Sequence, residues 1–109
     1  MFSVVYVTAG SQGEGEELAR GLVKEKLAAC VNIVPSVKSV YWWKGEVEEA
    51  KEVLLIIKTN DILIEQIINW VKSHHTYTVP EVIAMPIIKG NEQYLEWLGE
   101  SLKEKIKEL

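Results

Sequence analysis

Hydrophobic and polar residues alternate along this chain in two ways, and the alternation predicts where strands and helices lie. Met1–Thr8 is an apolar run rich in β-branched residues, which is typical of a central strand covered on both faces. After it, Ser11 and Glu14 have the spacing of a capping box and predict the start of a helix. The apolar stripe of that helix consists of Leu18, Ala19, Leu22, Val23 and Leu27.

The next segment, Ala29–Thr59, is predicted to be an unusually long β-hairpin. Its turn falls at Lys44-Gly45, because Gly adopts positive φ easily in a two-residue hairpin loop. Pro35 has no amide hydrogen to donate, so we expect a bulge beside it in the first strand. On the return strand, Val53–Ile57 is apolar on both faces and belongs in a core. Glu46–Glu52 is mostly acidic and is expected to project into solvent or a polar interface.

The second half of the chain predicts a helix, a strand and a final helix. Thr59 or Asn60 caps the first of these helices, whose buried stripe comprises Leu63, Ile64, Ile67, Ile68, Trp70 and Val71. Glu81–Ile88 is the last strand, and Pro86 predicts that it lies at a sheet edge. The final helix begins near Asn91. Its expected inward residues are Tyr94, Leu95, Trp97, Leu98, Leu102 and Ile106.

The predicted order is therefore βαββαβ followed by a C-terminal helix. Two βαβ units interleaved in one antiparallel sheet form the ferredoxin-like α+β sandwich. Residues 1–109 are enough for one core and one domain. Both helices then cover one face of the sheet, so apolar positions on the other face need a partner.

Composition narrows the class of protein. The chain is 48% hydrophobic and 26% charged, as in ordinary globular proteins, and its net charge of −4 without a basic stripe argues against nucleic-acid binding. No apolar run is long enough to span a membrane, so we expect a cytoplasmic protein. The fifteen Glu and eleven Lys resemble the surface composition of thermostable proteins. A single cysteine, Cys30, allows no intrachain disulfide and no all-cysteine metal cage.

Several motifs together resemble the CutA family of divalent-cation tolerance proteins. They are Leu27–Ile33, Tyr41–Glu46, Leu55–Thr59, His74–Glu81 and Tyr94–Leu98, in an order that covers nearly the whole chain. The resemblance implies a ferredoxin-like subunit similar to PII signalling proteins, three of which form a homotrimer by pairing strands across their edges. It also implies a cytoplasmic protein of copper and divalent-metal tolerance that catalyses no established reaction.

His74 and His75 are the strongest pair of metal-ligand side chains in the sequence. Imidazole suits Cu(II), Zn and Ni, and adjacent residues at a helix end can point to different sides. The resemblance implies a copper site that combines this pair with a cysteine of the first strand, where Val7 stands here. We predict a site for Cu(II) or another divalent metal, without an organic cofactor. The alternative is that one histidine bonds to strand backbone while the other is solvated.

A second candidate site combines Trp43, Lys58, Tyr77 and Glu81 in a cleft between subunits. A carboxylate, an ammonium group and aromatic rings could hold a small anionic ligand there, as in a PII-like signalling or scaffold protein. The alternative is an interface salt bridge between Lys58 and Glu81 with aromatic packing.

Tyr41-Trp42-Trp43 is predicted to anchor the trimer interface. Adjacent residues of a strand point to opposite faces, so at least one tryptophan should bury against another subunit. A nucleic-acid stacking platform is disfavoured, because no arginine accompanies these rings and the return strand is acidic. No nucleophile–base pair suggests an enzyme, and Cys30 is expected to be a buried structural thiol.

Overall fold

The computed structural model describes residues 1–109 and confirms the predicted order of elements. The elements are β1 (Phe2–Ala9), α1 (Gln12–Lys24), β2 (Cys30–Trp43), β3 (Glu46–Asn60), the single 3-10 turn η1 (Asp61–Leu63), α2 (Ile64–His74), β4 (Val82–Pro86) and α3 (Glu92–Lys107). Ser11 caps α1 by accepting a hydrogen bond from the Glu14 amide, as the capping box predicts. Asn60, not Thr59, caps η1, because the Thr59 hydroxyl is buried and donates to the Leu27 carbonyl.

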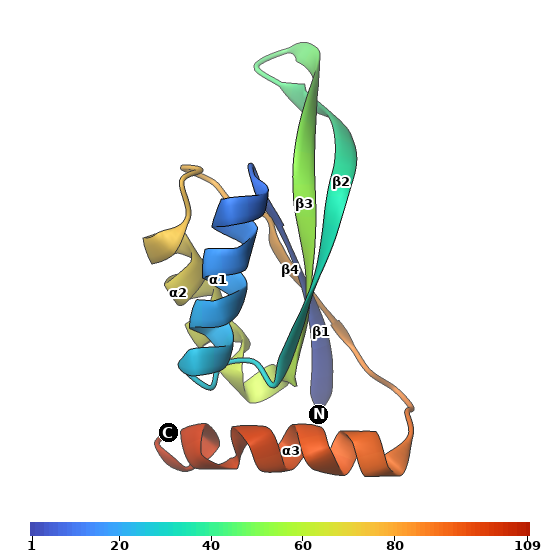
Figure 1. Ribbon diagram of the computed structural model, residues 1–109, viewed down its shortest axis with the longest axis vertical. Coiled ribbons are helices and arrows are strands. Elements are labelled where there is room, and N and C mark those ends of the chain that lie inside the picture. The colour runs from blue at the N-terminus through green and yellow to red at the C-terminus, as the bar shows by residue number, and fades with distance from the viewer.

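The four strands form one antiparallel sheet in the order β2-β3-β1-β4, which is the ferredoxin-like arrangement. Helices α1 and α2 cover one face of the sheet, and α3 lies across its lower end (Figure 1). The expected edge position of Pro86 is confirmed, since β4 pairs only with β1. The prediction that β1 is covered on both faces is wrong. Its residues alternate between buried and half-buried, because no helix lies over the second face.

The β2–β3 hairpin has the predicted turn and bulge. Lys44 and Gly45 both have positive φ, 51° and 81°, as the central residues of a type I′ turn require. The register shifts between Val34 and Val37, and Ser36 in the bulge has a φ of 61°. We define the near half of the hairpin as residues 30–34 and 53–60, and the far half as residues 37–52. In Figure 1 the far half rises beyond the helices, along the 44 Å longest dimension of the molecule.

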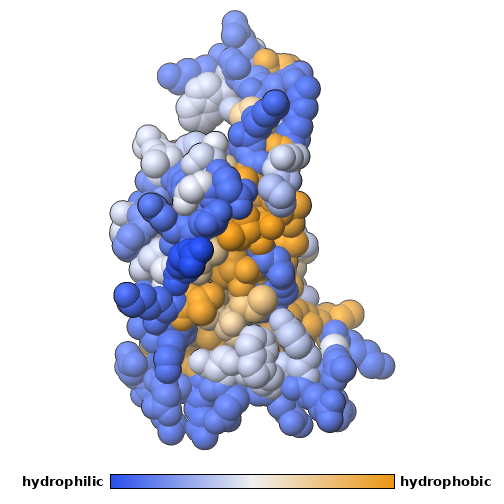
Figure 2. All heavy atoms as spheres, viewed as in Figure 1, coloured by the Kyte–Doolittle hydropathy of each residue, from blue (hydrophilic) through white to orange (hydrophobic).

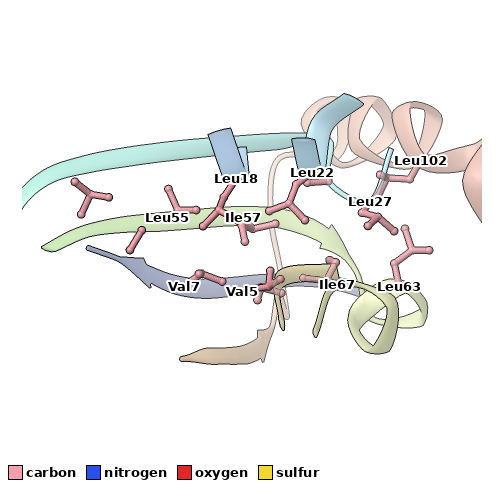
Figure 3. Packing of buried hydrophobic residues seen from close by; sticks show 14 of the residues in the cluster. Val5, Val7, Leu18, Leu22, Leu27, Leu55, Ile57, Leu63, Ile67 and Leu102 are labelled. Carbon is pink, nitrogen blue, oxygen red and sulfur yellow. The ribbon is translucent and has the colours of Figure 1, made fainter. Parts of the chain in front are cut away.

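The core lies between the sheet and the helices. Figure 3 shows Leu18 and Leu22 of α1 pointing toward Leu55 and Ile57 of β3, with Ile67 nearby. The buried cluster consists of Val5, Val7, Ala9, Leu18, Leu22, Leu27, Ala28, Val53, Leu55, Ile57, Leu63, Ile67, Val71, Leu98 and Leu102. Gly15 contributes by having no side chain, because a Cβ there would lie 2.6 Å from Cγ2 of Val53. Helix α1 can therefore pack closely on β3.

Three residues predicted to point inward are exposed. Val23 in the last turn of α1 is 42% exposed, because Leu18 and Leu22 already occupy the side of the helix that faces the core. Tyr94 and Trp97 are 41% and 47% exposed. Helix α3 crosses the end of the sheet instead of lying along it, so only Leu98 and Leu102 reach full burial.

Surface hydrophobicity differs between the parts of the molecule. Figure 2 shows hydrophobic atoms gathered beside α1 over the lower and middle part of the hairpin, whereas the tip is mainly hydrophilic. The face of the sheet without helices exposes Val34, Ile83 and Met85, as the sequence predicts. Individual aromatic side chains of the far half are also exposed.

Candidate functional site

His74 closes α2 with one ring nitrogen engaged and the other free. Its Nδ1 lies 2.7 Å from the Trp70 carbonyl oxygen, and since a carbonyl only accepts, Nδ1 carries the proton. The ring stacks on Trp70 with centroids 4.0 Å apart and planes inclined by 16°. Nε2 therefore presents a lone pair to solvent from a ring held in one orientation. This is the geometry of a histidine that can bind a metal ion.

His75 is turned the other way, into the protein. Its side chain is fully buried, and its Nε2 donates to the Thr8 carbonyl of β1 at 2.7 Å. Its Nδ1 accepts the backbone N–H of Tyr77 at 3.0 Å. Both ring nitrogens are thus used within the fold. The two histidines point in different directions, so in this conformation they cannot bind one ligand together.

Val7, at the position where the resemblance implies a cysteine, is a fully buried core residue of β1. It provides no ligand atom. The chain contains no cluster of three or more His, Cys, Asp or Glu side chains arranged to hold a metal ion. His74 is therefore the only one of the predicted ligands with a free nitrogen.

Glu14 fixes the segment after α2 to the start of α1. Its Oε2 accepts the Thr76 amide at 2.8 Å, its Oε1 accepts the Gly10 amide at 3.1 Å, and Nδ1 of His75 lies 3.5 Å from Oε2. Burial alone would raise the pKa of this carboxyl, but the hydrogen bonds from Thr76 and Gly10 outweigh burial and lower it. Glu14 thus holds in place the loop that follows the histidines.

A groove of about 780 Å³ lies between the far half of the hairpin and the loop before β4. Three of the predicted cleft residues, Trp43, Tyr77 and Glu81, line it, together with Thr8, Ser39, Val40, Tyr41, Glu52, Thr76, Thr78 and Val79. Lys58 does not. It pairs with Val4 and Cys30 in the near half of the hairpin, and the chain has no salt bridge between Lys58 and Glu81.

The groove is anchored by a contact that sequence reasoning missed. The Tyr77 hydroxyl donates to Oε2 of Glu52 at 2.7 Å, although the two residues are 25 positions apart. Burial first, then the hydrogen bond and charge of Glu52, raise the pKa of Tyr77 above its ordinary value. One feature of the sequence points to this contact: Glu52 is a charged residue directly before the apolar run that begins at Val53.

The aromatic residues predicted to anchor a trimer all lie in the far half. Tyr41, Trp42 and Trp43 are 42%, 74% and 53% exposed. The Lys44 ammonium lies 5.9 Å from the centre of the Trp43 ring.

Cys30, at the other end of β2, is a free and partly buried thiol. Burial, followed by the neighbouring Cys30, raises the pKa of Tyr94 in α3.

The fold and the site define a small ferredoxin-like protein that presents a histidine at a helix end and an acidic, aromatic groove beside a projecting hairpin. The family model described as CutA1 divalent ion tolerance protein matches residues 3–101. The chain therefore belongs to the CutA family of divalent-cation tolerance proteins, as the resemblance of its motifs predicts.

Among similar proteins, the divalent-cation tolerance protein CutA of Thermus thermophilus is 48% identical over 93% of this chain and 98% of its own length. Its solved structure has a TM-score of 0.91 with the same coverage. A structure from Archaeoglobus fulgidus, described as a periplasmic divalent cation tolerance protein, is 41% identical, with a TM-score of 0.91 over 94% of this chain and 99% of that one.

The rice protein CutA 1, described as chloroplastic, is 54% identical over 93% of this chain but only 57% of its own length. The chain thus spans little more than half the length of this plant relative. None of the helices in the structure is both long and apolar enough to cross a membrane.

Proposed function

We propose that this protein binds divalent metal ions, Cu(II) foremost, in support of metal tolerance, as a cytoplasmic homotrimer that catalyses no reaction. One observation carries the proposal. His74 offers an unengaged Nε2 to solvent while its Nδ1–H is held by the Trp70 carbonyl. Metal-binding histidines characteristically donate their second ring N–H in this way, which fixes the tautomer and the direction of the lone pair.

The two histidines receive different roles in this proposal. His74 is the ligand. His75 is a positioning residue, because its hydrogen bonds to Thr8 and Tyr77 join the end of α2 to β1 and to the loop before β4, which lines the groove and is called the groove loop. An imidazole nitrogen favours Cu(II) over the other divalent first-row metals, in accordance with the Irving–Williams order. Val7 stands where the resemblance implies a cysteine, so this position supplies no thiolate to favour Cu(I).

Binding at one imidazole per chain is expected to be weak and reversible, which suits a buffer of metal ions better than a permanent metal centre. Water or carboxylate oxygens complete the coordination of such an ion. The exclusion of catalysis rests on the absence of a nucleophile beside a base, and the family is named for tolerance to ions rather than for a reaction.

The homotrimer is proposed from the surfaces that a single chain leaves uncovered. The sheet ends in two edge strands, β2 and β4, and Trp42, on the face of the hairpin opposite to Tyr41 and Trp43, exposes a large ring to solvent. The cytoplasmic setting rests on composition, including the free Cys30, which is typical of reducing compartments.

The test is a calorimetric titration of the purified protein with Cu(II), repeated with His74→Gln. Because Nε2 is the proposed ligand, we expect the variant to lose the binding that the unchanged protein shows. Lys72→Gln, an exposed change in the same helix turn, is the matched control and should bind as before. Equal Cu(II) binding by the protein and by His74→Gln would overturn the site assignment.

A PII-like signalling or scaffold protein is the second candidate, and the location of the groove supports it, although the groove lining has no positive side chain for an anionic ligand. The groove brings Trp43, Tyr77 and Glu81 together, as expected for a ligand cleft, although Lys58 does not line it within one chain. Thermal-shift screening of metabolites against metal ions separates the two functions. If metal ions alone raise the midpoint of unfolding, the signalling candidate is wrong.

A further inference from the structure

The far half of the hairpin has two faces that differ in charge. Cross-strand partners share a face, so Tyr41 lies with Glu48, and Trp43 lies with Glu46. Glu52 continues the same face toward the sheet. The basic residues Lys38 and Lys51 oppose each other on the other face, and Lys38 forms an ion pair with Glu49 at 2.9 Å. Carboxylates and aromatic rings thus gather on the side of the groove.

The groove itself carries negative charge only. Its lining includes the carboxylates of Glu52 and Glu81 and no lysine, arginine or histidine side chain. The Lys44 ammonium lies near the Trp43 ring but belongs to the exposed turn and is not part of the lining. A small anion in this groove would find no positively charged side chain and would lie beside two negatively charged ones, so its binding is strongly disfavoured.

Glu52 is the carboxylate best placed to receive a ligand. The residue is only 9% exposed, and Oε2 is occupied by the Tyr77 hydroxyl. Oε1 has no hydrogen-bond partner in the chain. Every side-chain oxygen that is shielded from solvent in this structure does have a partner, so Oε1 must be accessible to solvent. The residue also lines the groove. A largely buried carboxylate with one free oxygen is suited to a charged donor.

The remaining walls suit an aliphatic cation. Tyr41, Trp43 and Tyr77 contribute aromatic rings, and Thr76, Thr78 and Ser39 contribute polar groups. Aromatic faces attract ammonium groups, as the Lys44 nitrogen 5.9 Å from the Trp43 ring illustrates. A volume of about 780 Å³ is in the range of clefts that hold small molecules.

We propose that this groove binds a small organic cation, a primary or secondary ammonium compound with an aliphatic body, whose N–H donates to Oε1 of Glu52. This inference goes beyond metal binding, since it uses neither His74 nor His75. It also replaces the anionic ligand of the signalling candidate with a ligand of opposite charge. The aliphatic body lies along the aromatic wall, and Glu81 adds a second attractive charge.

The experiment compares three probes of equal chain length: n-butylammonium, 1-butanol and butyrate. Each is titrated into ¹⁵N-labelled protein in the presence of EDTA, and the amide shifts of Thr76, Tyr77 and Thr78 are followed. We expect saturable shifts at these amides with n-butylammonium and none with 1-butanol or butyrate. Increasing salt should weaken the binding, because part of the attraction is between charges.

Glu52→Gln is the decisive variant, because its amide oxygen can still accept the Tyr77 hydroxyl while the charge is removed. It should weaken n-butylammonium binding about tenfold or more, as expected when a charge-assisted hydrogen bond becomes neutral. Glu49→Gln removes a carboxylate from the opposite face of the same strand and should leave binding unchanged. His74→Gln should also bind n-butylammonium normally, which separates this inference from the metal proposal.

Three results would overturn the inference. They are equal or stronger shifts with butyrate, equal weakening by Glu49→Gln and Glu52→Gln, and the absence of any shift at the groove amides. The last result would mean that a neighbouring subunit or the loop itself fills the groove.

Discussion

The two halves of the β2–β3 hairpin share one backbone ladder but differ in what covers their side chains. In the near half, β3 pairs with β2 on one side and β1 on the other, and Val53, Leu55 and Ile57 are at most 5% exposed. In the far half, β3 pairs with β2 alone, and Val47 is 58% exposed. The same strand is thus a core element at one end and an isolated ribbon at the other.

This difference separates the forces that hold the hairpin. Burial against α1 and β1 stabilises the near half, whereas the far half depends on the type I′ turn, cross-strand pairs and the bulge at Ser36. An isolated two-stranded ribbon is only marginally stable in water. The far half therefore needs a contact beyond its own ladder, and within one chain the structure supplies it through Glu52 and Tyr77.

The largest effect is expected from truncation in the near half. Leu55→Ala removes a fully buried side chain from the centre of the core and should lower the free energy of unfolding by about 2–5 kcal/mol. The matched change in the far half, Val47→Ala, should cost less than about 1 kcal/mol, because Val47 is mostly exposed. Urea unfolding measures both. Equal losses would show that the two halves are buried alike.

Trp42→Ala tests what covers the far half. Its side chain is 74% exposed in one chain, so the subunit fold should survive, as circular dichroism would show. If Trp42 anchors the proposed trimer, association should weaken by about 2 kcal/mol or more, because buried tryptophans dominate interfaces. Sedimentation at several concentrations detects the smaller species. Ile62→Ala, which truncates an exposed residue of η1, is the control, and a trimer unaffected by Trp42→Ala would remove the tip from the interface.

Tyr77→Phe breaks the one side-chain hydrogen bond between the far half and the groove loop. The loss should be about 1.5 kcal/mol, the lower end of the range for a hydrogen bond to a charged group, because the groove admits water. A double-mutant cycle with Glu52→Ala, which removes the acceptor, isolates the pair. Strict additivity of the two changes would mean that this contact does not couple the halves.

Acid should loosen the loop beside the groove through Glu14. Its pKa is lower in the folded protein than the ordinary 4.5, so its contribution to stability is fully present above that value. The contribution is lost as the pH falls below 4.5 and through the lowered folded pKa. Glu14→Gln should cost about 1 kcal/mol at neutral pH and progressively less in acid. Thermal unfolding from pH 7 to pH 3 measures this convergence, and a constant gap between the two proteins would contradict it.

Local patterns predicted the elements better than the site. The Lys44-Gly45 turn, the bulge after Val34 and the Ser11 cap depend on neighbouring residues, and all three are confirmed. The exposure of Tyr94 and Trp97 could not be read from helical periodicity, because it depends on how α3 crosses the end of the sheet. Helical spacing identifies a stripe but not the length of stripe that another element covers.

The site was predicted only as far as single residues allow. The sequence left open that one histidine bonds to strand backbone while the other is solvated, and this is the arrangement found. That His75 is the one that bonds depends on Thr8, which is 67 positions away. The position of Lys58 and Glu81 near strand ends suggests that they meet, but within one chain the strand register places Lys58 beside Val4 and Cys30. Contacts between distant segments decide which candidate side chains meet, and no local pattern encodes them.

The smallest effect is expected on the face of the far half that points away from the groove. Lys38 and Glu49 form an ion pair there, with side chains 67% and 57% exposed. Exposed pairs contribute little because solvent and salt screen them, so Lys38→Gln should change the free energy of unfolding by less than about 0.5 kcal/mol. Urea unfolding at low and high salt measures the change, which should shrink further as salt is added. A loss comparable with that of Tyr77→Phe would contradict the difference between the two faces. The Lys38–Glu49 ion pair would then stabilise the far half as much as the Tyr77–Glu52 hydrogen bond does.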